Sequence, residues 1–328
     1  MIANALFDFF AGSFTSTYYF GTLLNTAFLL MASSLGDTFM LTTGEFNLGG
    51  EGQIYAGGFT AAIILTVGTD ALPFLPPPLL LLLALASAMA VPACMMLVSA
   101  LLKHLKNAHI LLTTFLVSSA AIPFIDALIA GKFRGGANNL LATSFIAQAV
   151  RSPKIMSPSP LSLIALVPPL LCMCAWFVMY RTALGRTLQI TGISQEFAAY
   201  CGFPQKKIMY GTLALSGALH GCTGFIAVVG TYYTCHTGFY SGMGWNALSC
   251  ALIANANPAL LVPSSIFISW LFTSASRVAL NNNFGFDMGA LIQGLIIFCI
   301  ALRHIKRDAK RTHDSAQGSA VQGKCAHD

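Results

Sequence analysis

The sequence predicts an all-α polytopic membrane protein, and three observations carry this prediction. Of its 328 residues, 56% are hydrophobic and only 9% are charged, whereas a soluble domain carries roughly 25% charged residues. Uncharged stretches that reach the about 20 residues needed to cross a bilayer occupy 9–36, 71–102 and 107–125. The stretch 208–276 contains no Asp, Glu, Lys or Arg, which leaves room for roughly two or three further crossings.

The first apolar segment is expected to be a retained helix and not a cleaved signal peptide. It lacks the basic residues with which a signal peptide begins, and the acidic Asp8 precedes it. Prolines interrupt several of the later apolar runs, but membrane helices tolerate proline where neighbouring groups satisfy the freed backbone. The interruptions are at Pro92, Pro123, Pro168 and Pro169.

We therefore expect about eight to ten transmembrane helices and one broken or re-entrant segment near 41–58. The segment 36–52 is expected to be irregular because it combines glycines with acids. The helices are expected near 14–35, 53–69, 78–102, 107–129, 160–180, 208–234, 246–262, 263–280 and 287–303.

Basic residues predict the orientation of these helices. The tail after Leu302 and the segment 181–207 are both rich in Lys and Arg, so both are expected on the cytoplasmic side. Four predicted helices lie between them, which agrees with that assignment. The same count places the loop 131–159 outside although it is basic too, which conflicts with the positive-inside rule. The side of the N-terminus stays open, because it depends on whether 36–52 crosses the membrane.

The stretch LTTGEFNLGGEGQIYAGG (41–58) is the strongest signal for a transport pathway. An acid such as Glu51 costs roughly 2.5–3.5 kcal/mol at the membrane centre, so it is usually paired, cavity-facing or functional. Neighbouring glycines permit backbone conformations that other residues resist, and transporters use broken helices at their solute sites. The alternative is that Glu45 and Glu51 both lie at a membrane boundary, where neither has a special role.

A second stretch partly repeats the first one. TGFYSGMG (237–244) parallels TGEFNLGG (43–50), and each enters a small-residue apolar segment. Paired Gly-interrupted segments in two halves of a transporter indicate its pathway and a two-fold internal repeat. Together the two stretches give the candidate substrate-pathway residues Asn47, Gly49, Gly50, Glu51, Gly52, Gln53, Gly242 and Gly244.

Other chemistry finds no support in the sequence. No G-x-x-x-x-G-K-[ST] motif is present, so we expect no nucleotide site in this chain. The histidines have no zinc spacing, and no Ser or Cys has a convincing set of catalytic partners. We therefore expect neither an enzyme, nor a metal or cofactor site, nor a nucleic-acid site. The chain is predicted to form one membrane domain over 1–311 and a disordered cytoplasmic tail over 312–328.

Two motifs resemble a known family. GEFNLGGEGQ (44–53) resembles the signature G-x-x-N-[IL]-G-x-E-G-[QM] of permease subunits of bacterial ABC importers, in the branch of branched-chain amino acid, simple-sugar and nucleoside permeases. Gln53 makes it most similar to one permease type of nucleoside-type systems. The segment 181–202 resembles the family's cytoplasmic loop, R-T-x-x-G-x-x-[IL]-x-x-x-G-x-x-x-x-A-A-x-x-x-G. Two departures, Glu45 and Asn255 in place of a glycine, make the solute less certain than the class.

The resemblance implies how such a subunit would work. Permeases of this kind pair with a second permease, a cytoplasmic ATPase that binds the ATP, and an extracytoplasmic solute-binding protein. It also implies a bacterial inner-membrane location with a cytoplasmic C-terminus. The residues expected to couple to the ATPase, in 181–207, are Arg181, Gly185, Arg186, Gly192, Glu196, Ala198, Ala199 and Gly202. The alternative for 181–207 is an ordinary connector.

Three functions follow from these observations. The first is an ABC importer permease for a nucleoside or a related ribose- or sugar-containing solute. The second keeps this architecture but imports riboflavin, another vitamin or another sugar. The third is a stand-alone carrier or channel, which would not need a docking segment such as 181–207. Glu51 either contacts the solute or holds the broken helix, and the sequence leaves both roles open.

Overall fold

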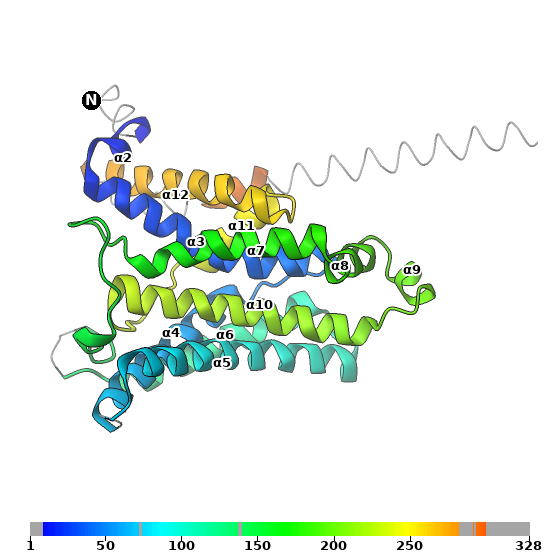
Figure 1. Ribbon diagram of the computed structural model, residues 1–328, viewed down its shortest axis with the longest axis horizontal. Helices are drawn as coiled ribbons and strands as arrows, with labels where there is room; N and C mark the ends of the chain where they lie inside the picture. The colour runs from blue at the N-terminus through cyan, green and yellow to red at the C-terminus, as the bar shows by residue number, and fades with distance from the viewer. Residues whose placement is uncertain (1–8, 72–73, 137–139, 282–290, 292, 300–328) are drawn as a thin grey trace, which may run out of the picture.

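The protein is a bundle of long helices with one irregular segment inside it, as the computed structural model in Figure 1 shows. The structure describes residues 9–71, 74–136, 140–281, 291 and 293–299. Within these residues, seven helices are long and apolar enough to cross a membrane, and an eighth apolar helix is shorter. The prediction of an all-α polytopic membrane protein is confirmed.

The order of the elements follows the apolar segments of the sequence closely. Short 3₁₀ helices cover Gln148–Val150 (η1) and Leu163–Leu166 (η2), and a π-helix, η3, covers Val228–Tyr232. The α-helices are α2 Gly12–Thr15, α3 Thr17–Thr42, α4 Gly50–Ala71, α5 Pro77–Lys106, α6 Ile110–Ala130, α7 Val167–Arg181, α8 Ala183–Ile193, α9 Gln195–Tyr200, α10 Gln205–Ala227, α11 Met243–Ile253 and α12 Pro258–Asn281.

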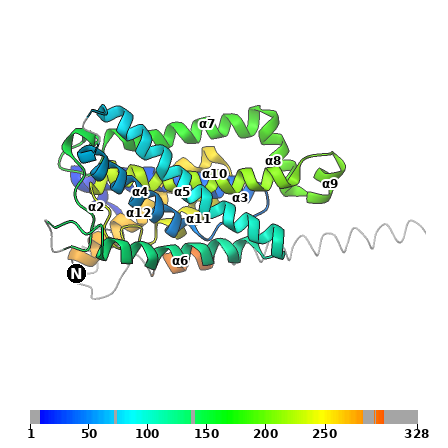
Figure 2. The ribbon, with the colours of Figure 1, turned by 90° about the horizontal axis from the view of Figure 1, so that it is seen from below.

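Helices α3 and α10 form the centre of the bundle. In the most apolar 18 residues of α3, and likewise of the span that α10 and η3 form together, 83% of the residues are buried. The corresponding share is 22% for α5 and 28% for α6. Figure 2 shows α7 and α6 on opposite sides of the bundle, with α3 and α10 between them. Small residues make the central packing close. A Cβ added at Gly221 of α10 would lie 2.0 Å from the carbonyl oxygen of Ala88.

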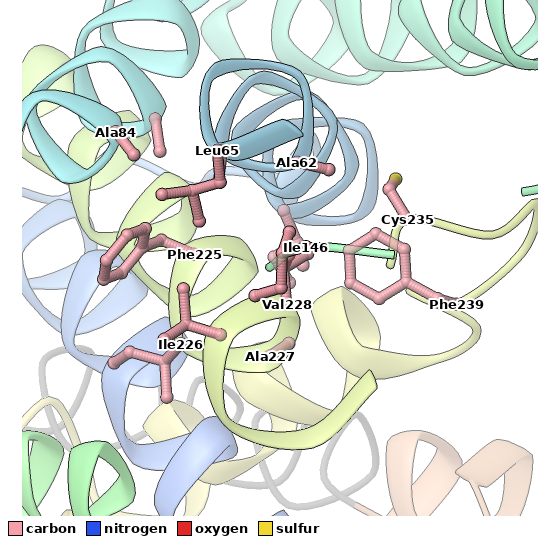
Figure 3. Close-up of a cluster of buried hydrophobic side chains, with 14 of the residues drawn as sticks. Ala62, Leu65, Ala84, Ile146, Phe225, Ile226, Ala227, Val228, Cys235 and Phe239 are labelled. Carbon is pink, nitrogen blue, oxygen red and sulfur yellow. The ribbon is translucent and has the colours of Figure 1, made fainter. Parts of the chain in front are cut away.

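The largest apolar cluster joins the central helices to the loops at one end of the bundle. Figure 3 shows Leu65 of α4, Phe225 and Ile226 of α10, and Phe239 of the loop before α11 in this cluster. Ile146, from the long segment between α6 and α7, is also fully buried in it. This end of the molecule is therefore a packed part of the fold.

The predicted irregular segment is too long, and this is a correction. α3 continues as a helix to Thr42, so only 43–49 is irregular. Residues 36–40 lie in the buried centre of the bundle, where the helix keeps their backbone groups hydrogen-bonded. Local glycines and an acid suggested a break that the central packing overrides.

The boundary between the last two described helices is also corrected. α11 ends at Ile253, and α12 begins at Pro258 instead of residue 263. Asn255 and Ala256 adopt left-handed backbone conformations, with φ of 48° and 54°, and proline favours the first position of a helix. Of the helix expected over 287–303, residues 291 and 293–299 are described and are helical, whereas the tail 312–328 lies wholly outside the described residues.

The loop 131–159 lies at the end of the bundle opposite α8 and α9 (Figure 1). Its backbone pairs with the loop after η3, where Thr143 N donates to Cys235 O at 2.9 Å and Ile146 N donates to Tyr233 O at 2.9 Å. Arg151 donates to Ile146 O and lies over the Tyr233 ring at 4.9 Å. Arg151 therefore has structural partners within this end of the bundle. Its charge is for that reason weaker evidence about the side of the membrane on which the loop lies.

Candidate functional site

The break between α3 and α4 turns back into the bundle instead of leaving it. Thr43 and Asn47 are buried, and Asn47 contacts Ser216, which lies eleven positions after the start of α10 at Gln205. At 1.5 Å per helical residue, that contact is about 16 Å along α10. The part of the break around Asn47 therefore lies at depth and is covered by protein, the condition under which such backbone survives in a membrane, whereas Gly44 and Phe46 are exposed.

Asn47 and Gln53 hold this break through a reciprocal amide pair. Asn47 Nδ2 donates to Gln53 Oε1 at 2.9 Å, and Gln53 Nε2 donates to Asn47 Oδ1 at 3.1 Å. Asn47 also accepts from Gly49 N at 2.8 Å and donates to Ser216 Oγ at 3.0 Å. Both side chains are at most 2% exposed. Their polar atoms are thus engaged in folding the break and fixing it to α10.

Helix α6 satisfies backbone groups at the start of α4. Thr114 Oγ1 accepts from Leu48 N at 3.2 Å, and Ser118 Oγ accepts from Gly52 N at 2.8 Å. This approach is close enough to require glycine, because a Cβ added at Gly49 would lie 2.6 Å from the carbonyl oxygen of Thr114. The sequence analysis identified the glycines but not the two α6 hydroxyls that they face.

The two stretches that resemble each other in sequence meet at the start of α4 and α11. Glu51 Oε1 accepts from Gly242 N at 2.9 Å, and Gly242 directly precedes α11. A Cβ added at Gly50 would lie 3.1 Å from the Cα of Gly244, so these glycines bring the two helix ends together. Glu51 therefore holds the second stretch against the first. The contact is independent of whether the stretches are a true repeat, which stays a hypothesis.

A buried acid and histidine lie beside this junction, and the sequence analysis missed them as a pair. Asp37 of α3 and His220 of α10 are 1% and 0% exposed, with Oδ1 and Nε2 separated by 3.5 Å. His220 Nδ1 donates to Ser216 O at 2.8 Å, so Nε2 is the nitrogen that faces the carboxylate. If Nδ1 carries the only proton of the ring, Nε2 is an acceptor that faces the acceptor Oδ1 of Asp37. A second proton, on Nε2 or on the carboxyl group, avoids this arrangement. The pair therefore joins the two central helices.

One signal for this pair was present in the sequence. Asp37 interrupts an apolar run, and it contributed to the expectation of an irregular segment over 36–52 instead of to a buried pair. An acid next to a predicted break is costly to bury without a partner. Its partner, His220, lies 183 positions further along the chain, so the sequence alone does not pair the two.

Aromatic side chains gather on the other side of Glu51. Tyr55, one turn further along α4, donates through its hydroxyl to Asp126 Oδ1 of α6 at 2.5 Å. Its ring centroid lies 4.8 Å from that of Tyr240 and 5.7 Å from that of Phe239. Tyr55 and Phe239 are buried in the core, so Tyr240 is the ring of these three that is partly exposed and available to a flat ring system.

The predicted coupling segment folds into two short helices at one end of the bundle. Thr182 caps α8 and Ser194 caps α9, each through its side-chain oxygen. Gly192 packs on the end of α3, since an added Cβ would lie 2.0 Å from Thr42 O. Gly185 packs as closely on α7, and Gly202 ends the segment with φ of 75°. The glycines are therefore packing and turn residues.

The remaining predicted coupling residues differ in their exposure. Ala198 is buried, and the others are exposed, namely Arg181, Arg186, Glu196 and Ala199.

The same segment also exposes large apolar side chains that the sequence analysis did not select. Tyr200 is 93% exposed, Ile193 85%, Leu184 71% and Phe197 57%. All four belong to α8 and α9, at the end of the bundle beyond the buried core (Figure 1). We call these four residues the α8–α9 apolar patch. Clustered exposed apolar residues of this kind mark interaction surfaces.

A multi-pass helical bundle with a covered helix break and a helical segment projecting at one end defines a membrane transport permease. The comparisons place it more narrowly. A family model described as "branched-chain amino acid transport system / permease component" matches residues 19–301. The chain belongs to this family of ABC importer permeases, which confirms the resemblance in the two motifs.

Curated relatives agree on the class and differ in the solute. The chain is 36% identical to the probable riboflavin import permease protein RfuC of Treponema pallidum, over 94% of this chain and 82% of that protein. It is 23% identical to a guanosine ABC transporter permease protein of Bacillus subtilis, over 92% of this chain and 86% of that one. It is 24% identical to a glucose ABC transporter permease protein of Haloferax volcanii, over 91% and 80%.

Proposed function

We propose that this chain forms the solute pathway of an ABC importer and is driven by a separate ATPase that docks on α8 and α9. The observation that carries this proposal is the α8–α9 apolar patch, which lies on a segment too polar and too short to cross a membrane. The chain has no P-loop motif, so ATP would bind to the partner. A stand-alone carrier is no longer an alternative, given the family.

The docking segment has a direct route to the break. Gly192 of α8 packs against Thr42 at the end of α3, and the break starts at the next residue. Displacement of α8 would therefore press on Thr43–Gly49 and on the Asn47–Gln53 pair within it. From there Glu51 leads to Gly242 and α11. This contact chain supports a role for α8 in transmitting motion.

The pathway itself is proposed to run past the start of α4 and α11. Glu51 is the residue we expect nearest to the solute, because its side chain is partly exposed while Asn47 and Gln53 are buried in their pair. The predicted glycines, at 49, 50, 52, 242 and 244, would set the spacing of the helices around it. A second permease subunit, identical or different, would complete the pathway, and a binding protein would deliver solute from outside.

The solute is proposed to be a flat heteroaromatic compound with a ribityl or ribose chain, with riboflavin first and a nucleoside second. The relative named as a riboflavin permease shares more identity with this chain than the one named for guanosine. Tyr240, which is partly exposed and lies 4.8 Å from the ring of the buried Tyr55, offers a ring face for stacking, which the glucose of the third relative would not need.

The docking proposal is tested by two acidic substitutions in the α8–α9 apolar patch. Ile193→Asp and Tyr200→Asp should each abolish co-purification of the ATPase, because a charge would be buried at the interface. Ile155→Asp is the matched control, since Ile155 is 49% exposed at the other end of the bundle. Full ATPase recovery with both patch variants would overturn the proposal.

The solute proposal is tested by uptake in the native host. Deleting the gene should abolish high-affinity uptake of radiolabelled riboflavin and leave labelled glucose uptake unchanged. Loss of guanosine uptake instead would establish the nucleoside alternative. Unchanged uptake of both compounds would exclude this solute class while leaving the docking test unaffected.

A further inference from the structure

A cavity of about 220 Å³ opens where the break meets the docking segment. Five segments meet there: the break, the end of α5, and parts of α8, α9 and α10. The side chains that line it are Thr43, Glu45, Lys103, His104, Asn107, Thr191, Gln195, Gln205, Lys206, Ile208 and Met209. Nothing in the proposed transport cycle uses this cavity.

The lining of the cavity favours an anion. Two lysines, Lys103 and Lys206, line the cavity together with one acid, Glu45, and that acid is paired with Lys103. Two ion pairs occur in the described part of the chain, and neither includes Lys206. The hydroxyls of Thr43 and Thr191 donate to Met40 O and Thr187 O. The preference for an anion therefore rests on the charged side chains and not on these hydroxyls. The cavity therefore has more cationic groups than its single carboxylate neutralises.

The position of Lys206 strengthens this reading. Lys206 and Lys207 lie in the first turn of α10, where the partial positive charge of the helix end disfavours cations. Lys103 and His104, by contrast, lie in the last turn of α5, where cations are favoured. An anion in the cavity would offset the unfavourable placement of Lys206 and would contact both helix ends.

The surface beside the cavity is apolar. Leu101 and Leu105 of α5 are 48% and 65% exposed, and both lie in the last two turns of the helix that contributes Lys103 and His104 to the cavity. A membrane-facing helix that ends in cations beside exposed leucines has room for an acyl chain and a charged head group together. Basic pockets between helices on the cytoplasmic side bind anionic lipid head groups in this way.

We propose that this cavity binds a phosphate group, carried by an anionic lipid or by a soluble phosphate compound, and thereby fixes the break to the docking segment. Thr43 and Glu45 belong to the break, while Thr191, Gln195 and Lys206 belong to the docking segment and the helix after it. A ligand that contacts both the break and the docking segment binds best to the conformation in which these two segments lie together. It therefore stabilises that conformation. Phosphate would thus regulate how the ATPase side is connected to the pathway.

The test measures thermal stability of the full-length protein in detergent during titration with phosphatidylglycerol, phosphatidylcholine or glycerol 3-phosphate. Phosphatidylglycerol should stabilise the protein and phosphatidylcholine should not. Lys206→Gln should raise the half-maximal phosphatidylglycerol concentration about fivefold, the value of one cation near an anionic head group. Glu45→Gln should lower it, because Lys103 is then released from its ion pair.

The control is Lys154→Gln, an exposed lysine in the loop at the other end of the bundle, which should leave the titration unchanged. Stabilisation by glycerol 3-phosphate alone would identify a soluble phosphate compound as the source, and stabilisation by phosphatidylglycerol only would identify a lipid. Equal effects of the two lipids, without an effect of glycerol 3-phosphate, would overturn the proposal. So would a wild-type response of Lys206→Gln.

Discussion

At the residue scale, several polar groups within the membrane bundle pair with groups from other parts of the chain. Asp37 faces His220, Glu51 accepts from Gly242, and Tyr55 donates to Asp126. In an apolar surrounding, an unpaired polar group costs several kcal/mol, so each pair fixes one helix against another. The break is built from such pairs and from glycines that let the partners approach.

The Asp37–His220 pair is expected to stabilise the fold. Asp37→Asn or His220→Asn alone should lower the free energy of unfolding by roughly 3–5 kcal/mol, because the remaining partner is left buried without its counterpart. The double variant should lose less than the sum of the two. Unfolding in a denaturing detergent series measures all three proteins. Strictly additive losses would show that the two residues do not interact.

Two substitutions of Glu51 separate contact with solute from support of the break. Glu51→Gln keeps an oxygen that accepts from Gly242 N, whereas Glu51→Ala removes it. If Glu51 acts only as a support, the Glu51→Gln variant retains transport. The Glu51→Ala variant then loses roughly 1–3 kcal/mol in its free energy of unfolding. Because we expect a solute role, Glu51→Gln should impair uptake with little effect on melting temperature. Asp70→Asn is the control, because Asp70 is an exposed acid near the other end of α4.

At the scale of elements, interruptions of helices carry the proposed function. α4 and α11 begin within the bundle with their first residues in contact, and α3 ends against α8. Helix starts carry a partial positive charge, which favours the Glu51 carboxylate at the first turn of α4. The intact helices, α5 to α7 above all, are more exposed and are suited to lipid or subunit contacts.

Gly192→Ala should uncouple α8 from the break. The added methyl group would lie 2.0 Å from Thr42 O, and overpacking of this kind typically costs about 1–3 kcal/mol. We expect the ATPase to co-purify, since the α8–α9 apolar patch is unchanged, while uptake falls severalfold. Gly211→Ala in α10 is the matched control, because no atom lies within 4 Å of its added Cβ. Normal uptake by Gly192→Ala would contradict the proposed route.

At the scale of the whole molecule, the two ends of the bundle have different characters. One end carries α8 and α9 with the α8–α9 apolar patch, and the other carries the paired loops around Ile146 and Tyr233 (Figure 1). The first end is the one on which we propose that the ATPase docks. The second has an ordered face, stabilised partly by Arg151, where a binding protein would dock.

Labelling of cysteines should give the orientation directly. Cys201, which is exposed at the end of α9, should react with a membrane-impermeant maleimide only in inverted vesicles. Ile155→Cys should react only in intact cells, in a background where the other cysteines are replaced. Labelling of both positions from the same side would contradict the proposed topology. A correct result would also show that the basic loop 131–159 lies outside.

By itself, the sequence determined the membrane class, most helices, the place of the break and the family. These follow from hydrophobicity, glycine content and short motifs, which are properties of adjacent residues. Only the tertiary structure decided which polar groups are paired, since Glu51 and Gly242 are 191 positions apart and Asp37 meets His220 only where α3 crosses α10. It also decided that α3 continues to Thr42, because burial in the centre of the bundle outweighs the local signals for a break.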